Sequence, residues 1–526
     1  MRNLIYSKKS NLVIFGLGIL SFFGSVFQGS YIYDGFHWGL VASNGQDFLN
    51  GKKPYDDFFV HYGFLTVLFQ ALALKFYNSV YSLLILSAFF YSVSIIFLAK
   101  LVQKYFSINY VYLFLCVVFF MQPFVVYPWH TYFIFFTSTI SLFFYLKKNL
   151  ISLFLFGLFL QLGFLFSESY KIFSIIIVLI SIIFVSLEAK NFKKIFKMVI
   201  FILVGYILPF LLFLIYLNSN NLVGSWLQHS KIPSIFMSEL NYSFFDLILN
   251  FTTNYILNSI NILSSGYYTL GLIINLICIY FILLSFFKKE KKLDFIFIAY
   301  FSLLLNFMLV FRHESFRFFC GPIIGILILF LFINNLKDIT KYLSVISVIF
   351  IAIISNPFEK GSSNRNFVNK SLKTSSYSEY AIPKFKKMNF QKDTWKHLSE
   401  FTSILEQVEK KCNNIKYFYN ATSDHYYYFM STDYFMLFQK IPGYSETSLK
   451  NYYDSLNHYY DKFIGKKLNS KVSERNIIIL RENYSTNYLR VDSFKINLKN
   501  YYIKNLPFSY NNKKKLLYIP NDCNLS

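Results

Sequence analysis

Charge is scarce in this sequence. Only 15% of its residues are charged, whereas 55% are hydrophobic and 21% are aromatic. A soluble domain carries charge on about a quarter of its residues, so the composition excludes an ordinary soluble fold for most of the chain. Hydrophobic runs of roughly 17 to 22 residues recur, which is long enough to cross a bilayer as helices. The sequence therefore predicts a multi-pass, α-helical membrane protein.

Cysteine and the common catalytic motifs are also scarce. Three of the five cysteines, Cys116, Cys278 and Cys320, lie in hydrophobic runs and are expected to be packing residues. Cys412 and Cys523 share the polar C-terminal part, where an extracytoplasmic location would permit a disulfide. No metal-binding spacing, nucleotide-binding glycine loop, Ser-His-Asp signature or internal repeat is visible. Cytosolic ATP or a nucleotide sugar therefore has no evident binding motif.

Acidic residues are outnumbered, with 27 Asp and Glu against 51 Lys and Arg, a net charge of +24. The basic residues before position 356 form short clusters between hydrophobic runs, as cytoplasmic loops do. Beyond it the charge is diffuse, so nucleic acid is not an expected partner. Lys8 and Lys9 place the N-terminus in the cytoplasm. No small-residue cleavage site follows the first run, so we expect that run to remain as a helix.

The hydrophobic runs predict about eleven spans. They lie at 12–27, 80–99, 109–126, 131–146, 149–166, 172–187, 198–217, 266–287, 293–311, 318–333 and 342–355. Phe64 to Ala73 is apolar but too short to span, and it predicts an interfacial helix on the outer surface. This layout gives a transmembrane domain at 1–355 and an outer, soluble α/β domain at 356–526. In the latter, Ile415–Asn420 and Asn476–Leu480 predict strands and Asp393–Lys411 a helix.

The stretch from Tyr31 to Gly63, the first loop, is too polar to lie in lipid. It carries acids and histidines between aromatic residues, which suggests a site for a polar substrate at the lipid boundary. The candidates are Asp34, His37, Asp56, Asp57 and His61. Asp34 has the chemistry of a general base for an acceptor hydroxyl. The alternative is that Asp34 caps a helix end or pairs with a loop lysine.

Two further outer loops carry candidate residues. Arg312, His313 and Arg317 form a natural cradle for a phosphate or pyrophosphate, the alternative being contact with lipid headgroups. Glu168 and Lys171 have the i,i+3 spacing of a pair at a helix end, and a role in the site is the alternative. No resident cofactor or metal site is predicted, although Asp56 and Asp57 could hold a divalent cation together with solvent.

The segment Asp34-Gly-Phe-His37-Trp38-Gly39, followed by Gly-Lys-Lys-Pro-Tyr-Asp-Asp-Phe at 51–58, resembles the GT-C superfamily of membrane glycosyltransferases. The nearest similarity is to protein O-mannosyltransferases and to bacterial enzymes that decorate lipid A or O-antigen. The resemblance covers most of 1–355 in architecture and only the first loop in motif. The family usually has Asp-Glu after its first helix. Here it is Asp34-Gly35, so Asp56, Asp57 or Glu168 would have to supply the second acid.

The resemblance implies a polyprenyl-phosphate-linked sugar as donor and a glycan, lipid or protein as acceptor, in the bacterial inner membrane. Asp34 would deprotonate the acceptor, which attacks the sugar with inversion. The leaving phosphate would be stabilised by the basic residues Arg312, Arg317, Lys171 and His313. The substrates would be positioned by His37, Asp56, Asp57, His61 and Glu168.

Three other functions remain open from the sequence, and one of them is a non-enzymatic assembly or receptor role carried by the outer domain. A transporter or flippase for lipid-linked glycans predicts charges within the spans and repeated halves. A glycan polymerase or ligase would use similar lipid-linked substrates, and the acidic first loop is the feature that favours a glycosyltransferase.

Overall fold

The computed structural model describes residues 6–354 and 382–523 with internal gaps. The gaps in the first range are 36, 61, 122–129, 189–190, 240–261, 288–291 and 309–319. Those in the second are 421, 423, 425, 432–433, 435, 440–472, 474, 483–499 and 507–514.

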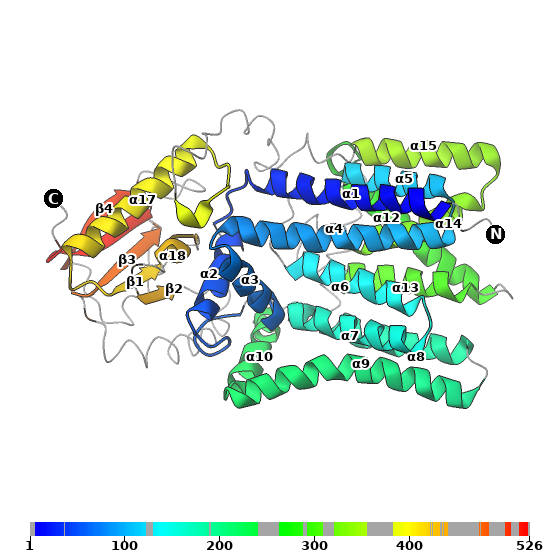
Figure 1. Ribbon diagram of the computed structural model, residues 1–526, viewed down its shortest axis with the longest axis horizontal. Coiled ribbons are helices and arrows are strands. Elements are labelled where there is room, and N and C mark those ends of the chain that lie inside the picture. Colours follow the sequence, from blue (N-terminus) through cyan, green and yellow to red (C-terminus); the bar gives the residue numbers. More distant parts are fainter. Residues whose placement is uncertain are drawn as a thin grey trace.

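Long helices form a bundle in which most of them run side by side (Figure 1). They are α1 (Tyr6–Gly29), α4 (Val80–Tyr105), α5 (Ile108–Met121), α6 (His130–Tyr145), α7 (Leu150–Phe166), α8 (Lys171–Glu188), α9 (Phe192–Ser219), α12 (Ile262–Phe287), α13 (Leu293–Met308), α14 (Cys320–Asn334) and α15 (Asp338–Ile354). Side-chain caps begin several of them: the side chain of Asn149 accepts a hydrogen bond from Ser152 N at α7, and that of Asn191 from Lys193 N at α9. Each predicted hydrophobic segment overlaps one of these helices.

Large apolar side chains cover the outside of the bundle. On α9 alone, Leu211, Leu212 and Ile215 are 48%, 59% and 64% exposed. Five helical segments of the described chain are long and apolar enough to cross a membrane: Asn11–Gly29, Val80–Tyr105, Glu168–Glu188, Phe192–Ser219 and Thr269–Phe287. Apolar surface on this scale is costly in water and is expected against lipid. The protein thus has the features of a multi-pass membrane protein.

Glycine allows close packing between α7 and α9. A Cβ at Gly157 would lie 2.2 Å from the carbonyl oxygen of Ile202, and one at Gly205 would lie 2.0 Å from that of Phe154. Small residues that bring helix backbones together are a common means of association where lipid removes the hydrophobic driving force.

Three further helices lie steeply to the bundle axis at one of its ends: α2 (His37–Leu49), α3 (Phe64–Phe76) and α10 (Val223–Glu239) (Figure 1). The helix expected at 64–73 is α3, while α2 occupies a stretch for which no helix was predicted. The weakly apolar stretch Phe244 to Ile256 also predicts an interfacial helix, and it lies outside the described residues. These three helices lie at the end of the bundle nearest the C-terminal domain (Figure 1).

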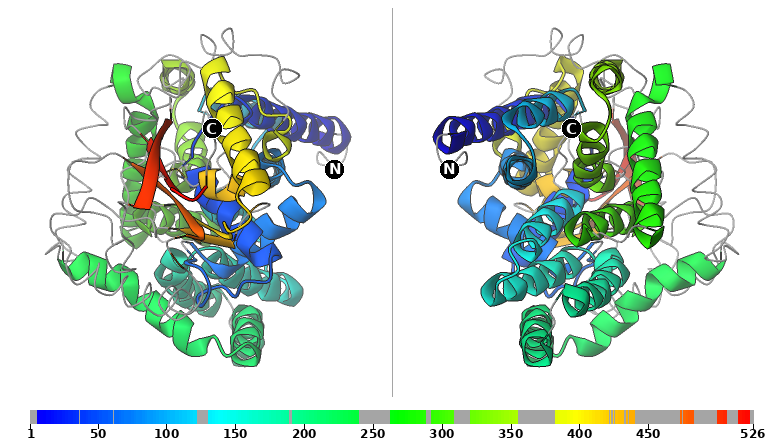
Figure 2. Two further views of the ribbon diagram at one scale, coloured as in Figure 1. Left: turned by 90° about the vertical axis from the view of Figure 1, so that its left-hand side faces the viewer. Right: turned by 90° about the vertical axis from the view of Figure 1, so that its right-hand side faces the viewer.

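The C-terminal domain contains a five-stranded sheet of order β2-β1-β3-β5-β4. Its strands are β1 (Tyr417–Asn420), β2 (Met436–Gln439), β3 (Ile477–Glu482), β4 (Tyr501–Leu506) and β5 (Lys515–Pro520). β1 pairs in parallel with β2 and β3, whereas β5 pairs antiparallel with β3 and β4. The predicted strands at 415–420 and 476–480 are therefore confirmed as β1 and β3. Figure 2 looks onto this domain in its left view and onto the opposite end of the bundle in its right view.

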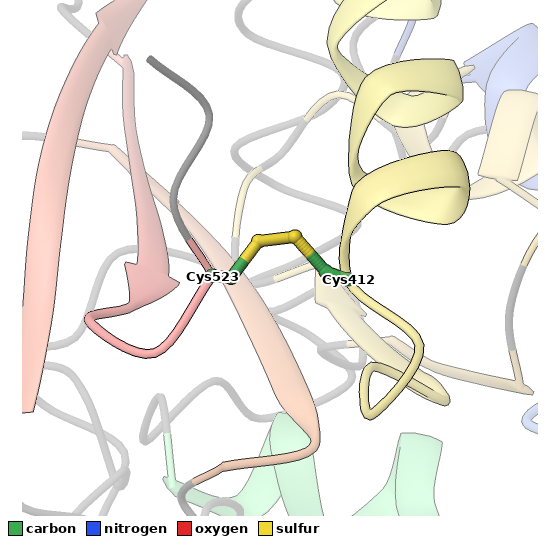
Figure 3. Close-up of a disulfide and its surroundings, with 2 residues drawn as sticks. All are labelled: Cys412 and Cys523. Carbon is green, nitrogen blue, oxygen red and sulfur yellow. A yellow bond between two sulfur atoms is a disulfide. The ribbon is translucent and has the colours of Figure 1, made fainter.

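Two helices accompany the sheet, α17 (Lys392–Lys411) and α18 (Tyr426–Ser431). The predicted helix at 393–411 is α17, which buries Trp395, Leu398, Phe401 and Leu405 at the spacing of one helical face. A disulfide joins Cys412, directly after α17, to Cys523 after β5 (Figure 3). The disulfide that the sequence permits is thus present.

One hydrophobic core joins the first loop to the C-terminal domain. It contains Ile32, Trp38 and Val41 from the first loop together with residues such as Phe385 and Trp395. Two hydrogen bonds to backbone carbonyl oxygens support the same junction: Asn389 N donates to Ser30 O over 2.7 Å, and the Ser79 hydroxyl donates to Lys386 O over 2.9 Å. The C-terminal domain therefore packs directly on the residues around Asp34.

Candidate functional site

Asp34 lies just before α2 and is bound to its first turn. Its Oδ1 accepts a hydrogen bond from His37 N over 2.8 Å, and its Oδ2 lies 2.9 Å from His37 Nδ1. The Asp34 carbonyl oxygen also accepts from the backbone N–H groups of Trp38 and Gly39. Asp34 is thus a helix cap, as one interpretation of the sequence held, and the same carboxylate also faces an imidazole.

We call Asp34 and His37 the Asp34–His37 pair. The Asp34 side chain is 8% exposed and that of His37 is 24% exposed. The carboxylate is therefore the inner member and the imidazole the more accessible one. A carboxylate that holds one ring nitrogen of a histidine orients the ring for proton transfer at the other nitrogen.

Residues of the C-terminal domain contact both neighbours of Asp34. The Tyr33 hydroxyl donates to Asp424 Oδ2 over 2.7 Å. A Cβ at Gly35 would lie 2.0 Å from Asp424 Oδ1, so that only glycine fits there without displacing the carboxylate. Burial and the negative charge of Asp424 raise the pKa of Tyr33 well above its usual value. Tyr33 therefore stays protonated as a donor across the physiological pH range.

A second contact holds the other end of α2. The Tyr428 hydroxyl lies 2.7 and 2.8 Å from the two carboxylate oxygens of Asp47, and Lys52 Nζ lies 2.7 Å from Asp47 Oδ1. Burial and the Asp47 charge raise the pKa of Tyr428 well above its usual value. The loop lysine that was a possible partner for Asp34 thus pairs with Asp47 at the far end of the helix.

Asp56 and Asp57 lie in a tight turn that begins at Lys53. Asp57 Oδ2 accepts from Lys53 N over 2.8 Å, and the Asp56 Oδ1 accepts from the Ser225 hydroxyl over 3.1 Å. Between them and Lys53, Tyr55 has a φ of 65°, a strained conformation for a large residue, and it is 1% exposed. Asp57 therefore holds the turn, and Asp56 ties it to α10.

The side chain of Glu168 contacts Trp226 and His229 of α10 rather than the Asp34–His37 pair. Its Oε1 accepts from Trp226 Nε1 over 3.1 Å and lies 3.9 Å from His229 Nδ1. Burial lowers the pKa of His229 to about 4, and a hydrogen bond with the Val60 backbone opposes this shift. His229 is therefore neutral at pH 7. This cluster holds the end of the first loop, since Glu168 N also donates to Tyr62 O.

The structure describes only one of the remaining candidates, Lys171. Lys171 begins α8, with its Nζ 6.0 Å from the centre of the Phe164 ring. His130, which was not among the candidates, lies at the start of α6, and its ring stacks on Tyr62 with 4.0 Å between ring centroids. His61 and the predicted phosphate-binding residues Arg312, His313 and Arg317 lie outside the described residues. Their roles remain predictions.

Several residues of this region were not identified as site candidates. They are Tyr33, Asp47, Trp226, Asp424 and Lys515. Asp424 and Lys515 are hundreds of residues from the first loop in sequence and lie in a polar region without a motif, so no local pattern marked them. Asp47 was visible in the first loop, but its position at the opposite end of a helix from His37 could not be foreseen because α2 was not predicted.

Asp56 and Asp57 do not belong to a larger group of metal-ligating side chains among the described residues. No group of three or more His, Cys, Asp or Glu side chains there is arranged to hold an ion. Asp56 and Asp57, the proposed cation ligands, contact Ser225 and the Lys53 backbone instead.

No protein-family model and no curated protein matches the chain. Function must therefore be argued from the site itself.

Proposed function

We propose that the protein is a membrane glycosyltransferase that transfers a sugar from a polyprenyl-phosphate donor to a cell-surface glycan, lipid or protein. The observation that carries this proposal is the Asp34–His37 pair at the end of the bundle, directly after the first apolar helix. A base placed there meets a lipid-linked donor at the membrane surface. The first-loop resemblance to GT-C enzymes supports the same assignment.

The paired geometry refines the role of Asp34. Both of its oxygens face His37, which makes the carboxylate less available to a substrate than the imidazole. In the proposed mechanism His37 receives the proton of the acceptor hydroxyl, while Asp34 orients the ring and stabilises its charged form. The deprotonated oxygen attacks C1 of the sugar, the bond from C1 to the phosphate oxygen breaks with inversion, and the polyprenyl phosphate leaves.

The leaving phosphate needs positive charge where its own charge develops. Arg312, Arg317 and His313, together with Lys171 at the start of α8, are the proposed source. The full layout belongs to the same proposal: about eleven spans, a cytoplasmic N-terminus, and a C-terminal domain on the periplasmic side of a bacterial inner membrane. On that side the domain is placed to recognise the acceptor.

The test is sugar transfer in membranes that contain a polyprenyl-phosphate sugar pool, with protein levels matched. Asp34→Asn and His37→Gln should each lower transfer about 100-fold or more, the range expected for losing a general base or its orienting group. Asp338→Asn is the control, because Asp338 is an exposed carboxylate in the first turn of α15. It removes the same charge from another helix start and should transfer sugar at the wild-type rate.

Unchanged transfer by Asp34→Asn and His37→Gln would contradict the assigned chemistry. A wild-type protein that transfers no sugar but moves lipid-linked glycan across the membrane would replace the glycosyltransferase with a transporter.

A further inference from the structure

Tyr33, Gly35, Asp424 and Lys515 form what we call the Asp424 cluster. It joins the chain on both sides of Asp34 to the C-terminal domain. Asp424 and Lys515 are each 1% exposed, and Lys515 Nζ lies 3.1 Å from Asp424 Oδ2. A buried ion pair of this kind is retained only where its geometry is well satisfied.

The Asp424 carboxylate has a fixed position. Its Oδ1 accepts from Tyr426 N over 3.1 Å, while its Oδ2 accepts from Tyr33 and Lys515. The turn that carries it is closed by Asn420, whose Nδ2 donates to the Asp424 carbonyl oxygen over 3.0 Å. Asp424 lies in the turn between β1 and α18, and Asn420, the last residue of β1, ties this turn to the sheet.

The Tyr33 side chain is also held in place by its packing. The Tyr33 ring packs against Phe390 and Tyr426 with centroid distances of 5.4 and 5.2 Å. At Gly35 the backbone approaches Asp424 so closely that a methyl group would overlap the carboxylate. Asp34, between these two fixed neighbours, therefore has little freedom to move without breaking the contact with the C-terminal domain.

We infer that Asp424 is a positioning residue for the Asp34–His37 pair, acting through Tyr33 and Gly35, so that the C-terminal domain completes the catalytic geometry. The role in catalysis rests on the proposed function, whereas the physical coupling does not. The C-terminal domain is, on this inference, part of the catalytic unit and not only a surface for recognising the acceptor.

The coupling is tested by hydrogen exchange on the full-length protein in detergent. The reporters are the amides of His37, Trp38 and Gly39, which donate to Asp34. Tyr33→Phe removes the hydroxyl and keeps the ring, and these amides should then exchange about tenfold faster. Tyr428→Phe is the matched control, because it removes a buried hydroxyl from the contact at Asp47. It should loosen that end of α2 and leave the Asp34 end at the wild-type rate.

Gly35→Ala provides a second variant, since its methyl group should displace the Asp424 carboxylate. Gly24→Ala is its control, because no atom lies within 4 Å of a Cβ built at Gly24. In the sugar-transfer assay, Tyr33→Phe and Gly35→Ala should lower kcat about tenfold and leave KM for the donor unchanged. A general loss of folding would instead lower the amount of active protein, which is measured separately by burst titration or folded yield.

The outcomes separate the two proposals. Wild-type exchange at the Asp34 end in both Tyr33→Phe and Gly35→Ala would overturn the coupling, whatever the protein's activity. Faster exchange with an unchanged kcat would overturn the positioning role. Faster exchange in a protein without any transferase activity would refute the glycosyltransferase and retain the coupling between the C-terminal domain and the first loop.

Discussion

At the scale of single residues, the C-terminal domain keeps ionisable groups away from water. His397 on α17 is 2% exposed and its Nε2 is bonded to the Tyr427 hydroxyl, which in turn accepts from Lys515 Nζ over 3.2 Å. Burial lowers the pKa of His397 to about 4, with the Lys515 charge acting in the same direction and Asp424 opposing it. The folded domain therefore contains neutral His397, next to the Asp424 cluster.

This burial predicts acid sensitivity. Because the unfolded chain takes up a proton near pH 6.5 that folded His397 takes up only near pH 4, the stabilising contribution is complete above pH 6.5. It is lost as the pH falls from 6.5 to 4, and it amounts to about 3 kcal/mol. We expect the Tm of the full-length protein to fall less between pH 7.5 and 5 in His397→Gln than in wild type. Equal falls in Tm would contradict the assigned role of His397.

At the scale of elements, the apolar runs decide the helices of the bundle, and this part of the structure was predictable. A run of apolar residues with a cap such as Asn149 specifies a helix from local information alone. The helix α2 was not predicted because its sequence mixes glycine, polar and aromatic residues, and its stability comes from a buried face that includes Trp38 and Val41. Tertiary packing, and not propensity, makes that segment helical.

The contact between α7 and α9 gives a prediction at this scale. Gly157→Leu would force side-chain atoms into the backbone of α9 and should destabilise the protein by about 1–3 kcal/mol or more. Gly16→Leu, on α1, is the matched control, since nothing lies within 4 Å of a Cβ there. Thermal unfolding in detergent should show a lower Tm for Gly157→Leu alone. Equal Tm values for Gly157→Leu and Gly16→Leu would contradict the close packing of α7 on α9 at Gly157.

At the scale of the whole molecule, the candidate site is assembled from opposite parts of the chain. Asp34 and His37 were both identified as candidates because they lie within one short motif, whereas their pairing was not predicted. The contact of Tyr33 with Asp424, which spans 391 positions, was not visible because the polar C-terminal region has no pattern that indicates its partner. Long-range docking of this kind depends on shape and burial, which a single sequence does not display.

The disulfide gives a prediction at this scale. Cys412 and Cys523 are 111 positions apart, and closing a loop of that length stabilises a fold by about 2–5 kcal/mol. Replacing both with serine should increase hydrogen exchange throughout α17 and β5 and leave α7 and α9 unchanged. If α17 and β5 exchange at the same rates in wild type and in the double variant, the sheet and α17 hold together without the covalent link.

The contact between Tyr33 and Asp424 also sets an order in time. At a synthesis rate of about 5–20 residues per second, the ribosome adds Asp424 roughly 20 to 80 s after Tyr33. Lys515 and the second cysteine of the disulfide follow later still. The first loop is thus made early and lacks its partners until Asp424 and Lys515 have been added. A nascent chain that stalls before β5 would hold its first loop without the ion pair of Asp424 and Lys515, so the Asp424 cluster forms only after β5 has been made.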